Sequence, residues 1–375
     1  SGAVEVYVRS AGWADEADAP RPIAWPGSAP GLGGVEPAMF TAVVPIVGLQ
    51  LGRAVEDPGG RWHAYIEAIA EAQRRDPAHV RLFPTRLAGI TPQGRLAQLL
   101  SSSQYLAEPD VHAEIEEPMP GLRRRDLAQG VAQWISPLNG YRLQIFISHT
   151  KRQGTPEEPV AGLLRQVRAV LDASRLRAFF DAHDLQPGED WDRALRQEAG
   201  ASALLALRTD LYATREWCQR EMLSAKVHGM SVVVLEALTE GETRGSFLMD
   251  HTPRIPAHRQ PDGSWSVVGI RRAVNLLADA WLHRVLWLRQ RELAATHPQL
   301  RRYWWAPYAP EPSTFAAWLP EVTDAAGTTE AGLRILHPDP PLGPDEVQVL
   351  QQIASLAGRG PLDLTTPRLL SARGA

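Results

Sequence analysis

Between residues 141 and 293 the sequence alternates short apolar runs with amphipathic stretches, and this alternation constrains the fold more than any other feature. Apolar runs of strand length lie at 143–148, 178–181, 203–207 and 231–235. Segments with helical spacing of their apolar residues lie at 160–174, 191–199, 214–228 and 270–293. Strands that alternate with helices favour a parallel sheet with helices on both faces. We therefore predict an open α/β domain over 141–293.

The sequences on either side of this domain carry weaker patterns. Residues 1–100 hold an expected strand at 4–8 and a strand–helix–strand pattern at 43–47, 62–73 and 80–84, and residues 101–140 form a connector with a short helix at 122–134. Residues 300–375 show a Pro-rich passage after Trp304 and Trp305, a strand at 333–337 and a helix from Asp345 through Leu356. The last segment is too short to form a core alone. We expect 1–100 and 300–375 to pack into one accessory α/β unit; two unrelated extensions are the alternative.

The composition excludes several classes of function. A formal net charge of −4 gives no basic surface for nucleic acid. The single cysteine, Cys218, allows neither an intramolecular disulfide nor a zinc site built from cysteines. The sequence lacks a membrane-spanning apolar stretch and a signal-peptide pattern. We expect a cytoplasmic protein without a bound metal, and the scarcity of lysine beside abundant Ala, Gly and Pro is typical of a bacterial source.

Polar residues follow the predicted strands at 148–152, 181–191 and 209–212. In open parallel sheets the ligand crevice lies outside the carboxyl ends of the strands, so these segments are the candidate site. The phosphate loop GxxxxGK[ST], a GxGxxG sequence after a strand and HExxH are all missing from the sequence. A Rossmann-type dinucleotide cofactor is therefore not expected.

Three segments resemble a known family. The sequences IFISHTKR at 145–152, FFDAHDLQPGEDW at 179–191 and TREWCQRE at 214–221 are similar, in this order and spacing, to the first strand, the BB loop and the third helix of a Toll/interleukin-1 receptor (TIR) domain. The resemblance covers about 140–290, well under half of the chain, and implies a flavodoxin-like parallel sheet. Many members cleave NAD⁺ between nicotinamide and ribose with a glutamate on the third helix. The family motif, an aromatic residue followed four positions later by glutamate, falls on Trp217 and Glu221.

The residues themselves also single out Glu221. At about 100° per residue, Glu221 falls inside the apolar arc of its helix, which also holds Trp217, Cys218, Met222 and Ala225. An ordinary surface glutamate, the alternative interpretation, would lie on the opposite side with Gln219 and Arg220. Nicotinamide in NAD⁺ is already a cationic leaving group, so its departure needs no proton. One carboxylate near the ribose is enough to stabilise the positive charge that develops there.

The remaining candidates would bind the substrate. Ser148, His149, Thr150 and Lys151 occupy the loop that lines the NAD pocket in the family. Lys151 or Arg152 offsets the pyrophosphate charge in this interpretation, and the alternative is a solvated turn. Trp191 either stacks on a flat ring of the dinucleotide or only packs against the start of the next helix.

The resemblance implies an NAD⁺ nucleosidase that releases nicotinamide and ADP-ribose or a cyclic ADP-ribose, with NAD⁺ as substrate and no cofactor. It also implies self-association, because the BB loop of one copy helps to complete the pocket of the next, and a role in bacterial defence against phage. Adaptor-type TIR domains often lack the glutamate, so Glu221 favours the enzyme. The alternative is a non-enzymatic interaction module that acts through the BB loop.

Overall fold

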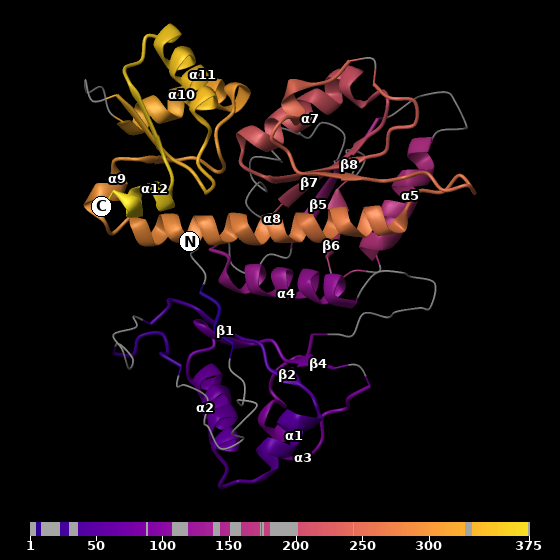
Figure 1. Cartoon of the computed structure of the whole chain (residues 1–375), viewed down its shortest axis with the longest axis vertical. Coiled ribbons are helices and arrows are strands. Elements are labelled where there is room, and N and C mark those ends of the chain that lie inside the picture. Colours follow the sequence, from indigo (N-terminus) through magenta and orange to yellow (C-terminus); the bar gives the residue numbers. More distant parts are fainter. Residues whose placement is uncertain are drawn as a thin grey trace. The chain divides into compact units, whose positions relative to one another are not determined.

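The computed structural model describes residues 5–8, 23–29, 37–87, 89–106, 119–137, 143–150, 159–172, 174, 176–180, 202–242, 244–326 and 332–373. The chain divides into two compact units, one formed by residues 4–134 and the other by residues 135–375 with residues 1–3. Figure 1 shows the elements of both units along the chain. The candidate site lies in the second unit, so the first is described only briefly.

The N-terminal unit contains two small parallel sheets. Strand β1 (Thr41–Val43) pairs with β3 (Val80–Leu82), and β2 (Ile46–Val47) pairs with β4 (Thr85–Arg86). The helices are α1 (Leu49–Glu56), α2 (Arg61–Arg75), α3 (Gly94–Leu99) and α4 (Met119–Ile135). The predicted strand–helix–strand pattern and connector helix are confirmed. The strand expected at 4–8 is wrong, because residues 5–8 have no regular structure and expose the side chains of Val6 and Val8 to solvent.

The central sheet of the second unit is parallel throughout, as predicted. Its strands, in the order in which they lie side by side, are β6 (Arg177–Phe180), β5 (Gln144–Ser148), β7 (Ser202–Arg208), β8 (Ser231–Glu236) and β9 (Arg254–Pro256). The chain therefore leaves β5 toward β6 on one side and returns to β7 on the other. Such a reversal of strand order creates a crevice at the carboxyl ends of the two strands that flank it. Here these strands are β5 and β7.

Helices cover both faces of this sheet (Figure 1). They are α5 (Pro159–Asp172), α7 (Glu216–Val227) and α8 (Val267–Ala294), together with the single turns η1 (Tyr212–Thr214) and η2 (Phe247–Met249). Leu204 and Ala206 of β7 pack in one cluster with Cys218 and Met222 of α7. Alternate residues of β7 point to the opposite face, so both faces of the strand are buried and its sequence is apolar throughout. The helix expected at 191–199 lies outside the described residues.

The C-terminal segment adds a three-stranded parallel sheet in the order β10 (Trp304–Trp305), β11 (Leu333–Leu336), β12 (Leu362–Thr365). Its helices are α9 (Pro298–Arg301), α10 (Pro312–Ala326), α11 (Pro344–Leu356) and α12 (Pro367–Ala372). The segment clusters with the central sheet, whereas the N-terminal unit builds its own sheets. How residues 1–100 and 300–375 associate stays a prediction. Within the described part of the chain, no helix combines the length and the apolar character that a bilayer crossing requires.

The Pro-rich passage after Trp305 contains helix α10, which the sequence analysis does not predict. Helix α10 forms there because Phe315, Trp318 and Val322 recur at helical spacing and are buried in the core of the C-terminal segment. Pro312 stands at the first position of the helix, where proline costs no hydrogen bond. Burial of the aromatic stripe outweighs Pro320 inside the helix.

Helix α7 ends in a Schellman motif. The amide of Met230 donates to the carbonyl of Ala225 at 2.9 Å, and the amide of Gly229 donates to the carbonyl of Lys226 at 3.1 Å. Gly229 has a φ of 70°, and a Cβ atom at this position would lie 2.5 Å from the Cβ atom of Pro307. Both the backbone conformation and the neighbouring proline therefore require glycine.

We expect Gly229→Ala to lower the free energy of unfolding by about 2 kcal/mol or more, from the left-handed conformation and the clash together. Urea unfolding measures this change. Gly162→Ala in α5 is the control, because a Cβ atom there meets no atom within 4 Å, and it should stabilise the helix by up to about 1 kcal/mol. Equal midpoints for the two variants would contradict the account of the helix end.

Candidate functional site

Hydroxyl groups meet across the carboxyl ends of β5 and β7. Ser148, the last residue of β5, and Tyr212, in the turn after β7, are both fully buried, and their oxygens lie 2.7 Å apart. The hydroxyls of Thr150 and Thr209 lie 3.3 Å apart and are also buried. These two contacts join the segments that follow β5 and β7, at the crevice that the strand order predicts.

Glu221 reaches the same place from α7. The helix buries Cys218, Glu221, Met222 and Ala225, which share one face at helical spacing. Glu221 is only 3% exposed, and its Oε2 atom accepts a short hydrogen bond from the hydroxyl of Ser148. The sequence-based placement of Glu221 inside the apolar arc is therefore what the structure has, and its carboxylate is not that of an ordinary surface glutamate.

The hydrogen bonds form a chain with one direction. A serine hydroxyl has a single proton, and the Ser148 proton goes to the carboxylate of Glu221. Tyr212 must then donate its own proton to the oxygen of Ser148. The chain therefore runs from Tyr212 through Ser148 to Glu221 and fixes the rotamer of each side chain.

Burial keeps Tyr212 and Cys218, two ionisable groups near Glu221, uncharged at neutral pH. Burial raises the pKa of Tyr212 well above its ordinary value, and the nearby Cys218 and Glu221 add to this shift. Burial, and next the charge of Glu221, raise the pKa of Cys218 to about 12. At neutral pH Cys218 is therefore a thiol, and a thiol is a poor nucleophile. Its sulfur lies 3.6 Å from the carbonyl oxygen of His149, to which it donates a weak hydrogen bond.

The structure brings some of the predicted residues together and leaves others out. Ser148, Thr150 and Glu221 are buried near the carboxyl ends of β5 and β7, and the backbone of His149 contacts α7 through Cys218. Trp217 lies in the first turn of α7, outside its buried face, and is 47% exposed. Lys151, Arg152, Trp191 and the loop at 181–190 lie outside the described residues.

The sequence does not single out Tyr212 and Thr209, although both lie in the polar segment at 209–212. The sequence feature that points to them is their position among the first polar residues after the third predicted strand. Only the pairing of β5 with β7 shows that these hydroxyls face Ser148 and Thr150.

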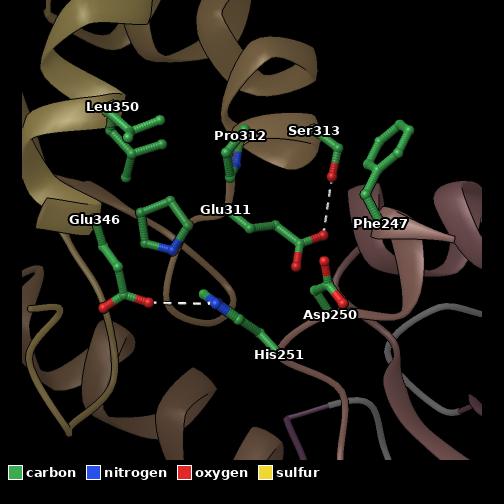
Figure 2. Close-up of a pocket in the computed structure, with 10 residues that line it drawn as sticks. Phe247, Asp250, His251, Glu311, Pro312, Ser313, Glu346 and Leu350 are labelled. Atoms are coloured by element: carbon green, nitrogen blue, oxygen red, sulfur yellow. Dashed lines mark hydrogen bonds and ion pairs between the residues drawn. The ribbon is translucent and has the colours of Figure 1, made fainter. Parts of the chain in front are cut away.

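A separate pocket of about 400 Å³ lies between the end of η2 and the helices α10 and α11 (Figure 2). Its walls include Phe247, Asp250, Glu311, Glu346 and Leu350, which differ from the residues predicted to bind NAD⁺. Among the described residues, no group of three or more His, Cys, Asp or Glu side chains is arranged to hold a metal ion. The candidate site is the hydroxyl and carboxylate cluster of Ser148, Tyr212 and Glu221, at the carboxyl ends of β5 and β7.

The comparisons with known proteins identify the class of the central domain. Residues 145–251 match the family model of the TIR domain, so the chain contains a TIR domain that begins in β5 and extends just beyond η2. Among solved structures, the TIR domains of the activated Roq1 resistosome, which directly recognizes the pathogen effector XopQ, align with 15% identity over 40% of this chain and 98% of theirs. The TM-score of this alignment is 0.22, and the likeness supports no further conclusion. No curated protein matches the chain.

The buried tyrosine predicts a loss of stability at alkaline pH. The unfolded chain releases the tyrosine proton near pH 10, whereas the raised pKa of Tyr212 keeps the proton in the folded chain. Above about pH 10 the unfolded state binds fewer protons, so the free energy of unfolding falls as pH rises, by up to about 1.4 kcal/mol per pH unit for one group. Urea unfolding between about pH 8 and pH 11 measures this slope.

Tyr212→Phe should make the slope shallower by the contribution of one proton, while Cys218 keeps part of it. The matched control is Tyr7→Phe, because Tyr7 is exposed and its replacement should leave the slope unchanged. A slope that Tyr212→Phe does not alter would show that this hydroxyl ionises without unfolding.

Proposed function

We propose that the chain is a TIR-domain NAD⁺ nucleosidase that releases nicotinamide together with ADP-ribose or a cyclic ADP-ribose. TIR domains include enzymes that cleave NAD⁺, and this chain has the glutamate that such enzymes use at the matching position, Glu221. The observation that carries the proposal is the burial of this carboxylate at the carboxyl ends of β5 and β7. Open α/β sheets bind their ligands at this edge.

The chemistry requires little beyond a placed negative charge. The bond between the ribose C1′ atom and the nicotinamide nitrogen breaks, and its electron pair neutralises the cationic ring. Positive charge then develops on the ribose, and the carboxylate of Glu221 stabilises it in surroundings with little water. Water that attacks C1′ gives ADP-ribose and a proton, whereas a ring nitrogen of the adenine or a ribose hydroxyl gives a cyclic product.

The chain of hydrogen bonds from Tyr212 would hold the carboxylate of Glu221 in the fixed orientation that this mechanism needs. A carboxylate with a fixed rotamer is already oriented before the substrate arrives, so the reaction involves no reorganisation of that charge. Ser148, His149 and Thr150 line the same edge in this proposal. Trp217 stacks its half-exposed ring on the dinucleotide, and Lys151 and Trp191 complete the site as the family resemblance implies.

The burial of Glu221 also favours one rival. In the rival function, the hydrogen bond from Ser148 to Glu221 in the core serves only to anchor α7 to the sheet. In that case the TIR domain is a non-enzymatic interaction module that binds a partner through its BB loop. Replacement of Glu221 distinguishes the two functions, since only the enzyme needs the negative charge for turnover.

We expect Glu221→Gln to lower the rate of nicotinamide release by about 100-fold or more, because the change keeps the size of the side chain and removes its charge. Incubation with NAD⁺ and product identification by mass spectrometry measures the rate and the product class together. The control is Glu216→Gln on the same helix, where the exposed carboxylate pairs only with Arg220 among the contacts described for it. It should retain full activity. Undiminished release by folded Glu221→Gln would assign the site to the rival function.

Self-association is part of the same proposal, as is a setting in the bacterial cytoplasm and in defence against phage. If the BB loop of one copy completes the pocket of the next, turnover should depend on assembly. Fusion to an oligomerising coiled coil is expected to raise the rate of nicotinamide release per chain, measured across protein concentrations. A strictly monomeric form with undiminished activity would count against this arrangement.

A further inference from the structure

The end of α7 is held by the C-terminal segment. The hydroxyl of Tyr308 donates to the carbonyl of Lys226, and the indole nitrogen of Trp318 donates to the carbonyl of Val227 at 2.8 Å. The last carbonyls of a helix have no partner within the helix itself. Tyr308 and Trp318, from the segment before β11, therefore add a second donor at the carbonyl of Lys226, which already accepts from the amide of Gly229, and supply a donor to the carbonyl of Val227.

A buried ion pair fixes the same end of the helix. The Nζ atom of Lys226 lies 2.8 Å and 2.9 Å from the two carboxylate oxygens of Glu311, and 2.9 Å from the carbonyl oxygen of Asp250. The side chains of Lys226 and Glu311 are 5% and 6% exposed. Burial lowers the pKa of Lys226, and the bonds to Glu311 oppose this shift.

Glu311 is itself held in one orientation. Its carboxylate accepts a hydrogen bond from the hydroxyl of Ser313 at 2.9 Å, and its backbone amide donates to the hydroxyl of Thr314. Figure 2 shows the side chain of Glu311 between Asp250 and Ser313, in the wall of the pocket. The carboxylate therefore presents a fixed target to the ammonium group on α7.

Such a pair is better suited to positioning than to stability. Removal of two charges from water costs about as much as their attraction returns, so an apolar pair of the same volume gives similar stability. The ion pair instead fixes the position of α7, because three hydrogen bonds at the ammonium group of Lys226 are directional and allow the helix one location. Lys226 lies five residues from Glu221 on the same helix of 12 residues, which is a rise of about 7.5 Å along a rigid rod.

We propose that Glu311 is a positioning residue: through Lys226 it sets the location of α7 and thereby aligns the carboxylate of Glu221 with the ribose. This inference rests on the proposed NAD⁺ cleavage for its kinetic consequence. Errors of about 1 Å in the placement of a catalytic group can lower the rate 100-fold. On this account the C-terminal segment is part of the working catalytic domain.

The single cysteine of the chain provides a test that needs no substrate. Cys218 lies on the buried face of α7 and is 2% exposed, so a maleimide reaches it only when the helix moves away from the sheet. We expect Glu311→Gln to raise the rate of Cys218 labelling by about tenfold or more, because the variant leaves a buried ammonium group without its counterion. The control is Glu346→Gln, which breaks the exposed pair with His251 in the wall of the same pocket and should leave labelling unchanged.

Kinetics supply the second readout. Glu311→Gln should lower kcat for nicotinamide release while changing KM for NAD⁺ by less than about twofold, because Glu221 acts on charge that develops in the transition state. A double variant, Lys226→Met with Glu311→Met, removes both buried charges and is expected to fold with near-native stability. It should still label rapidly and turn over slowly, since it lacks the directional bonds.

The outcomes separate the two proposals. Wild-type rates of labelling and of turnover in the folded double variant would overturn the positioning role and leave the ion pair as structural only. An increase in labelling for Glu311→Gln, with no nicotinamide release from any form of the protein, would support the positioning of α7 and reject NAD⁺ cleavage. If Glu311→Gln fails to fold, the double variant decides by the same two measurements.

Discussion

The hydrogen bond from Ser148 to Glu221 is the contact on which the candidate site depends. It joins the end of strand β5 in the central sheet to helix α7, two elements that lie far apart in the sequence. A buried carboxylate is costly without a donor, so the bond is required once Glu221 lies on the inner face of the helix. Tyr212 extends the same chain to the turn after β7. One connected group of side chains thus orients the carboxylate of Glu221 and links α7 to β5 and to the turn after β7.

The C-terminal segment contacts helix α7 of the TIR domain and supports its last turn. Its own core contains Phe315, Trp318 and Leu350, with Val227 of α7 packed against it. The ion pair between Lys226 and Glu311 and the caps from Tyr308 and Trp318 all act on the last turn of α7. The helix that carries Glu221 is therefore held near its middle by Ser148 of the sheet domain and at its last turn by the C-terminal segment.

Some of this arrangement was readable from the residues and some was not. The apolar runs at 143–148, 203–207 and 231–235 predicted strands because burial on both faces leaves no polar position in a parallel sheet. Strand β9 has only three residues, two of which are Arg254 and Pro256, so its sequence has no apolar pattern that predicts a strand. It forms because its backbone pairs with the edge of β8. The sequence does not predict helix α10, because its prolines indicate a break in regular structure. Its apolar residues at helical spacing are nevertheless buried in the core of the C-terminal segment.

The sequence by itself determined that the central part of the chain, with its TIR domain at 145–251, has a parallel α/β fold, and that Glu221 lies on the inner face of its helix. The α/β class and the inner position of Glu221 follow from local periodicity, which depends on burial residue by residue, whereas the TIR type follows from the resemblance of three sequence segments to that family. Only the tertiary structure decided that Tyr212 and Ser148 complete a chain of hydrogen bonds to Glu221, and that Glu311 binds Lys226 across 85 positions of sequence. Contacts of this kind leave no periodic pattern, because each joins two segments that are far apart in the sequence and meet only in the folded chain.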